Sequence, residues 1–132
     1  MHDVNLLLVL VSAIIMMVVG AIWYSPGLFG QAWLKAMNKK KSDFKRSGKV
    51  LATGFITSFI LAYLLSIVIN MSGADTFMLG ALAGFWVWLG FIFTTHLEVR
   101  MYEHRPWQIF TIYTGMQLVN LLLIGGLIAI WG

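Results

Sequence analysis

Four long apolar runs separated by short polar segments dominate the pattern of the chain. The runs cover about residues 4–24, 50–71, 76–97 and 107–131, and none of them contains Asp, Glu, Lys or Arg. A helix needs roughly 20 apolar residues to cross the hydrocarbon core of a bilayer. The alternation of polar and apolar residues that marks an outer-membrane strand is missing. We therefore predict an all-α polytopic membrane protein, with residues 1–132 forming one domain of four transmembrane helices.

A shorter helical pattern follows the first run, within the loop 25–49. Pro26 and Gly27 stop the first helix, and apolar residues then recur at helical spacing over residues 28–37, with polar residues opposite. An amphipathic helix of this kind lies in the plane of the membrane interface. We predict a short interfacial helix directly after the first transmembrane helix.

The basic residues define the expected orientation. All nine Lys and Arg residues lie in two segments, 32–49 and 98–105. Positively charged short loops stay on the cytoplasmic side of a membrane, so we expect both basic loops inside and both termini outside. The net charge of +4 comes from these loops. It predicts attraction to the anionic headgroups of membrane lipids at the basic loop, and no nucleic-acid partner.

Composition excludes several other classes of protein. The chain is 60% hydrophobic, with a mean hydropathy of +0.86, which would expose too much apolar surface for a soluble domain. The absence of Cys excludes disulfides, thiol catalysis and zinc thiolate sites. No nucleophile elbow, Walker loop or dinucleotide-binding fingerprint is present. We therefore expect no catalytic residues, no cofactor and no enzymatic activity.

One group of residues near the second basic segment resembles a metal or acid/base site: His96, Glu98, Glu103 and His104. His96 and Glu98 are two positions apart and so diverge on a helix. Glu103 has arginine neighbours with which it can pair. We expect these residues to be solvated at a helix end, and we predict no metal site.

Small residues predict where the helices pack. The second run carries such residues at a strict spacing of four, and the third run has a similar patch. They are Gly54, Ser58, Ala62, Ser66 and Asn70 in the second run, and Gly80 and Gly84 in the third. Small residues let helix backbones approach closely in lipid. The pattern leaves open whether these faces meet within one chain or between copies, and we expect a homo-oligomer.

A polar cluster is predicted near the middle of the membrane. Trp88 lies too deep for an interfacial aromatic belt and shares a side with the glycines of the third run, so its indole N–H needs a buried acceptor. The fourth run offers Tyr113, Gln117 and Asn120 on one helical face. These four residues form either a hydrogen-bond network between helices or a ligand-binding pocket.

Two functions fit these features. The first is non-enzymatic binding of a small molecule or lipid, or a role in membrane organisation. The alternative is an oligomeric passive transporter or channel for a small neutral or cationic solute, lined by uncharged polar side chains. Proton-coupled transport is disfavoured, because the spans lack the ionisable residues that serve as relays.

The segment GAIWYSPGLFGQAW, residues 20–33, resembles the hallmark of the domain of unknown function 1761 family of small bacterial membrane proteins. The resemblance extends over the whole chain and implies four helices in a bacterial inner membrane. It supplies no function and no catalytic residues. It implies that the motif residues determine the shape of the loop; they are Trp23, Tyr24, Ser25, Pro26, Phe29, Gly30 and Trp33.

Overall fold

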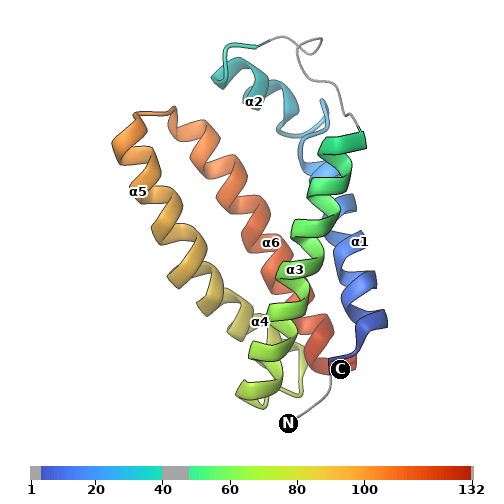
Figure 1. Cartoon of the computed structure of the whole chain (residues 1–132). Coiled ribbons are helices and arrows are strands. Elements are labelled where there is room, and N and C mark those ends of the chain that lie inside the picture. The colour runs from blue at the N-terminus through green and yellow to red at the C-terminus, as the bar shows by residue number, and fades with distance from the viewer. Residues whose placement is uncertain (1–3, 40–47, 132) are drawn as a thin grey trace.

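A computed structural model describes residues 4–39 and 48–131 (Figure 1). The described residues form seven helical segments, which make up four long helices and one short one. The helices are α1 (Leu6–Trp23), α2 (Gly30–Ala36), α3 (Gly48–Ser72), α4 (Phe77–Val87), η2 (Trp88–Phe93), α5 (Thr94–Glu103) and α6 (Trp107–Trp131). No strand occurs in the described residues. The prediction of an all-α fold with a short helix after the first long one is confirmed.

The elements α4, η2 and α5 run on from one another as a single long helix, Phe77–Glu103. This helix, α1, α3 and α6 are each long and apolar enough to cross a membrane, which is the architecture of a multi-pass membrane protein. The third helix extends past the predicted limit of residue 97 and ends where His104 takes a left-handed conformation, with φ 55°. Its middle, η2, is a π-helical segment.

Side-chain caps fix where two of the helices begin. The side chain of Asn5 accepts a hydrogen bond from the Leu8 amide at 3.2 Å at the start of α1. The Thr76 hydroxyl accepts one from the Leu79 amide at 3.1 Å at the start of α4. Each cap satisfies an amide that has no partner within its own helix.

Glycines bring α4 and α6 into backbone contact. A Cβ added at Gly80 would collide with the carbonyl group of Gly125, and one added at Gly84 would collide with the carbonyl group of Leu121. In the second helix, a Cβ added at Gly54 would lie 3.4 Å from the Met17 sulfur of α1. The predicted small-residue faces of the second and third runs therefore both meet partners within one chain.

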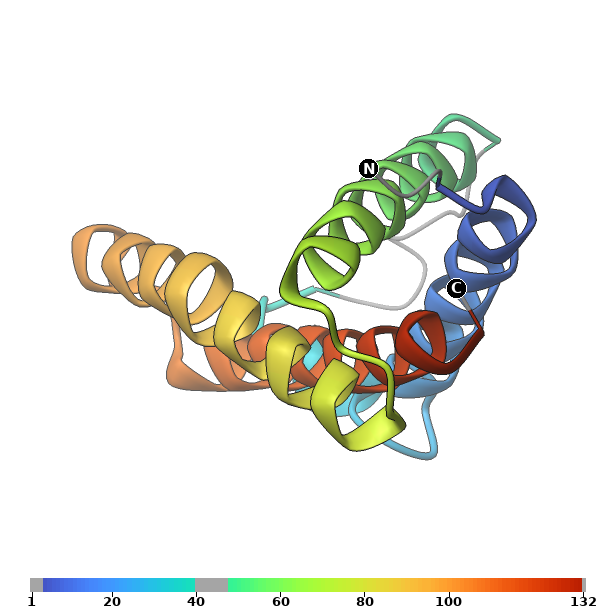
Figure 2. The ribbon, with the colours of Figure 1, turned by 90° about the horizontal axis from the view of Figure 1, so that it is seen from below.

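The two ends of the bundle differ in how closely the helices approach one another. Buried apolar side chains fill the end near the termini: Leu8, Leu65, Ile69, Leu121, Ile124 and Ile128. Toward the other end α3 and α5 diverge, and α2 lies across this end of the bundle (Figures 1 and 2).

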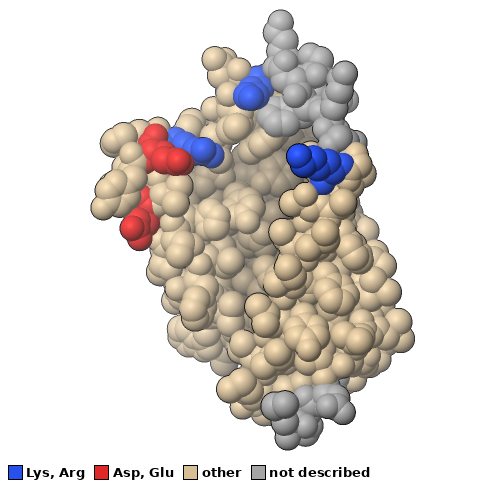
Figure 3. Space-filling model, in the orientation of Figure 1, with Lys and Arg blue, Asp and Glu red and all other residues tan. Residues whose placement is uncertain are grey.

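Charged residues gather at the end that α2 crosses, on the face that Figure 3 shows. We call this the basic end; its described cations are Lys35, Lys39, Lys49, Arg100 and Arg105. Part of the basic loop that is predicted to attract lipid headgroups lies outside the described residues. This part contains Lys40, Lys41, Lys45 and Arg46. The space-filling view also shows that the surface beneath α2 is hollowed.

Candidate ligand-binding pocket

A tight turn in the aromatic motif carries the chain from α1 into α2. The carbonyl oxygen of Ser25 accepts hydrogen bonds from the amides of Leu28 and Gly30, each at 3.0 Å. Pro26 follows Ser25 at the position where its fixed φ favours such a turn. A Cβ on Gly30 would collide with the carbonyl groups of Tyr24 and Ser25. Only glycine therefore allows this close approach of the backbone.

The aromatic side chains of the motif hold the turn against α6. The Trp23 indole donates to the Ile112 carbonyl oxygen at 2.8 Å, and its ring centroid lies 4.7 Å from that of Phe29. The rings of Tyr24 and Trp33 meet edge to face at 5.4 Å. The motif thus joins the end of α1, the start of α2 and the first turns of α6.

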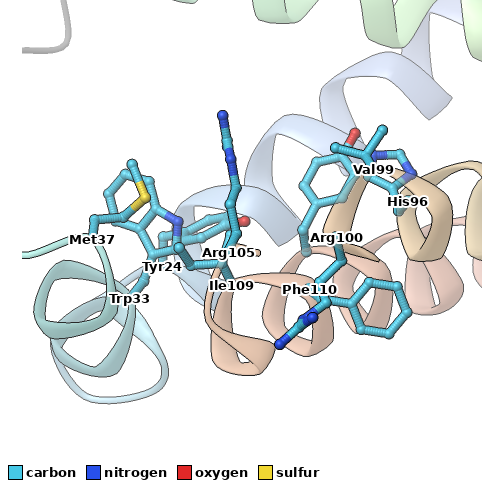
Figure 4. A pocket seen from close by; sticks show the side chains of 10 residues that line it. Tyr24, Trp33, Met37, His96, Val99, Arg100, Arg105, Ile109 and Phe110 are labelled. Atoms are coloured by element: carbon cyan, nitrogen blue, oxygen red, sulfur yellow. The ribbon is translucent and has the colours of Figure 1, made fainter. Parts of the chain in front are cut away.

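A cavity of about 290 Å³ lies between this motif, α5 and α6. In Figure 4 the side chains of Tyr24, Trp33 and Met37 are grouped apart from those of His96 and Val99. The remaining lining residues are Arg100, Arg105, Ile109, Phe110 and Tyr113. None of the described residues that line the cavity is Asp or Glu, so the pocket combines apolar walls with positive charge.

Two arginines supply this charge in different ways. The guanidinium carbon of Arg100 lies 3.9 Å from the centre of the Trp107 ring, in a cation–π contact. Its Nε is buried and has no hydrogen-bond partner among the described residues. Arg105 donates from Nε to Glu103 at 2.8 Å, but both side chains are about half exposed, which makes that pair weak. Arg100 is therefore the better-placed cation for a ligand.

His96 presents a defined nitrogen. Its Nδ1 lies 2.9 Å from the carbonyl oxygen of Ile92. Because a carbonyl can only accept, Nδ1 carries the proton and Nε2 is the acceptor in the neutral ring. The imidazole also packs on Tyr113, with ring centroids 4.6 Å apart. The Tyr113 hydroxyl in turn accepts a hydrogen bond from Gln117 Nε2 at 3.1 Å.

Tyr24, one residue beyond α1, contributes a neutral phenol. Burial, and secondarily the nearby Tyr113, raises the pKa of Tyr24 to about 12. Its hydroxyl therefore keeps its proton at physiological pH and can serve as a hydrogen-bond donor.

The residues of the predicted midplane cluster fall into separate groups. Trp88 faces α6, but its indole donates to the Thr114 carbonyl oxygen at 2.8 Å instead of to a side-chain amide. A backbone carbonyl has two lone pairs and can accept this bond while remaining part of its helix. Tyr113 and Gln117 are bonded to each other, and Tyr113 also lines the pocket. Asn120 is only 2% exposed, and its side chain makes none of these bonds.

The contribution of α5 to the pocket was not predicted from the sequence. His96 and Glu98 were predicted to diverge on the helix and to be solvated at its end. The pocket instead uses His96 and Arg100, which are four positions apart and so lie on one face of α5. Glu98 is exposed. The spacing of four between His96 and Arg100 was the available signal.

Metal ligands do not gather at this pocket. Within residues 4–39 and 48–131, no group of three or more His, Cys, Asp or Glu residues is placed to hold a metal ion. Among the described residues, His96 is the sole one of these types that lines the cavity.

Comparison with known proteins gives a family and no closer relative. No curated protein matches the chain, and no solved structure matches it. The model of one family, described as protein of unknown function (DUF1761), matches residues 7–129. That span includes the whole aromatic motif and every residue that lines the pocket. The chain therefore belongs to the DUF1761 family.

Proposed function

We propose that this protein binds an anionic amphiphile, without enzymatic turnover, in the pocket at the basic end. The observation that carries the proposal is the position of Arg100. Its guanidinium is stacked on Trp107, and its buried Nε has no partner. A buried donor without a partner is costly, and a carboxylate or phosphate is the natural acceptor for a guanidinium.

The walls of the pocket suit the apolar part of such a ligand. Trp33, Met37, Val99, Ile109 and Phe110 surround the arginines with aromatic and aliphatic surface. The volume of about 290 Å³ lies just below the range for small-molecule sites, roughly 300–1,000 Å³. It accommodates a headgroup or a small amphiphile and is too small for a whole two-chain lipid.

The place of the pocket in the bundle supports a ligand from the membrane. It lies where the apolar helices meet the charged segments, which is headgroup depth for a bundle that spans a bilayer. We propose a bacterial inner-membrane location with the basic end cytoplasmic and both termini outside. Anionic lipids would then be concentrated at the mouth of the pocket by its own arginines and by the neighbouring lysines.

The test compares an anionic ligand with a zwitterionic one. Native mass spectrometry of the protein with short-chain phosphatidylglycerol or short-chain phosphatidylcholine reports how much of each is retained. We expect preferential retention of phosphatidylglycerol. Arg100→Gln should weaken it about tenfold or more, since a hydrogen bond to a charged group contributes about 1.5–3 kcal/mol.

Lys35→Gln is the matched control, because it removes one positive charge from an exposed position of α2 that does not line the pocket. It should leave retention nearly unchanged. Equal weakening by the two substitutions would mean that only general charge attraction is at work, and the proposed site would be wrong.

A further inference from the structure

Four buried side-chain atoms lack a hydrogen-bond partner among the described residues: Ser12 Oγ, Arg100 Nε, Gln117 Oε1 and Asn120 Oδ1. The Ser12 hydroxyl can reach a carbonyl of its own helix by changing its side-chain rotamer. An amide oxygen can only accept. Turning the Gln117 amide would let the Tyr113 hydroxyl donate to Oε1, but it would leave Nε2 without a partner instead. Gln117 and Asn120 are three positions apart on α6, so two unmet acceptors lie next to each other inside the bundle.

These acceptors lie further along the face of α6 that lines the pocket. Ile109 and Tyr113 line the cavity. Gln117 and Asn120 follow on the same face of α6, because the steps of four, four and three residues bring each side chain back to one side of the helix. The hydrogen bond from Gln117 to the Tyr113 hydroxyl joins the two parts directly. The polar face therefore leads inward from the basic end.

What these oxygens require is a neutral donor. Asn120 is only 2% exposed, and no described carboxylate lies near to balance a cation in so apolar a setting. Water fits, because a buried water needs two to four polar partners. Gln117 Oε1 and Asn120 Oδ1 supply two acceptors, and the Tyr113 hydroxyl supplies a donor. We infer that water occupies a recess that extends from the pocket along α6 to Asn120.

The recess is closed on its inner side. Beyond Asn120 come Leu121, Ile124 and Ile128, which are at most 1% exposed and belong to the apolar cluster at the end near the termini. Such a cluster offers water no hydrogen-bond partner. Water therefore enters from the basic end and stops near the middle of the bundle. This inference does not depend on which ligand the pocket binds.

Cysteine accessibility tests the recess cleanly, because the chain contains no Cys. Gln117→Cys and Asn120→Cys place a thiol in the recess. Val119→Cys places one at the same depth on the outer side of α6, where Val119 is 38% exposed. In liposomes of unlabelled bacterial phospholipid, a small charged methanethiosulfonate reagent modifies only thiols that water can ionise.

We expect Gln117→Cys to react at least about tenfold faster than Val119→Cys, and only when the reagent is added on the side of the basic end. Equal rates at the two positions would overturn the inference, and so would equal reaction from both sides. If Asn120→Cys does not assemble, as judged by its size-exclusion profile, the half-buried Gln117→Cys carries the test. This experiment measures the accessibility of thiols and not the affinity of a ligand. A negative result would therefore overturn the water-filled recess and leave the proposed ligand-binding function untouched.

Discussion

The indole of Trp23 donates a 2.8 Å hydrogen bond to the carbonyl oxygen of Ile112, which is 89 residues further along the chain. Two residues later on α6, the carbonyl oxygen of Thr114 accepts a bond of the same length from Trp88. One donor comes from the end of α1 and the other from η2. The first turns of α6 are thus held from two helices by tryptophans that would otherwise bury an unmet N–H.

Loss of the Trp23 bond should lower the stability of the bundle. Trp23→Phe keeps an aromatic ring but removes the donor, so we expect the free energy of unfolding to fall by about 1 kcal/mol. Thermal unfolding in detergent, followed by circular dichroism, measures the change. Trp86→Phe is the control, because Trp86 is 58% exposed and its indole has no hydrogen bond to any of the described residues. A loss of equal size in the control would show that the indole donor is not responsible.

The contact between α4 and α6 should tolerate no side chain at its glycines. A Cβ at Gly84 meets the backbone of Leu121, which a rotamer change cannot relieve. We expect Gly84→Ala to cost about 1–3 kcal/mol and to reduce the yield of folded protein. Gly90→Ala lies in the same long helix, where an added Cβ meets nothing within 4 Å. If both substitutions lower the unfolding midpoint equally, the close approach of the two backbones is not what matters.

The four spans and the short helix could be predicted because hydropathy and turn signals are local. The partners of each helix are not local properties. Gly80 and Gly84 indicated a close approach, but only the fold shows that Gly125 and Leu121 supply the facing backbone. Trp88 indicated a buried acceptor, and the acceptor proved to be a main-chain oxygen, which any residue type provides.

The pocket was harder to predict because several elements build it. Taken alone, the polar residues at the end of α5 predict a solvated helix end. In the fold, His96 and Arg100 are half-buried against Tyr113 and Trp107 of α6. Tyr24 and Trp33 line the same cavity from the aromatic motif and α2. The spacing of residues along the chain does not indicate that residues 24–37 lie close to residues 96–113.

Ionisation of Tyr24 should be visible at high pH. Because burial raises its pKa to about 12, from an ordinary value near 10, the folded protein keeps this phenol neutral where the unfolded chain loses the proton. The resulting stabilisation is fully present below about pH 10 and is lost as the pH rises through 12. The absorbance of tyrosinate near 295 nm reports the titration. Tyr24→Phe should remove a component centred near pH 12, and an unchanged curve would contradict the burial.

The shape of the motif turn should control ligand affinity more than the stability of the bundle. A Cβ at Gly30 collides with the carbonyl groups of Tyr24 and Ser25, so Gly30→Ala must displace the turn that places Tyr24 and Trp33 in the pocket wall. Because the apolar cluster near the termini lies at the other end of the bundle, we expect the helical content to persist. Retention of short-chain phosphatidylglycerol should fall about tenfold or more, the equivalent of at least about 1.4 kcal/mol.

Gly27→Ala is the matched substitution within the same turn, because an added Cβ there meets nothing within 4 Å. It should leave both binding and folding intact. A Gly30→Ala protein that still binds as tightly as the native chain would show that Tyr24 and Trp33 are not needed where the turn places them. The aromatic wall would then be irrelevant to the ligand, and binding would rest on the arginines alone. A Gly30→Ala protein that unfolds altogether would instead show that the motif supports the whole bundle through its contacts with α6.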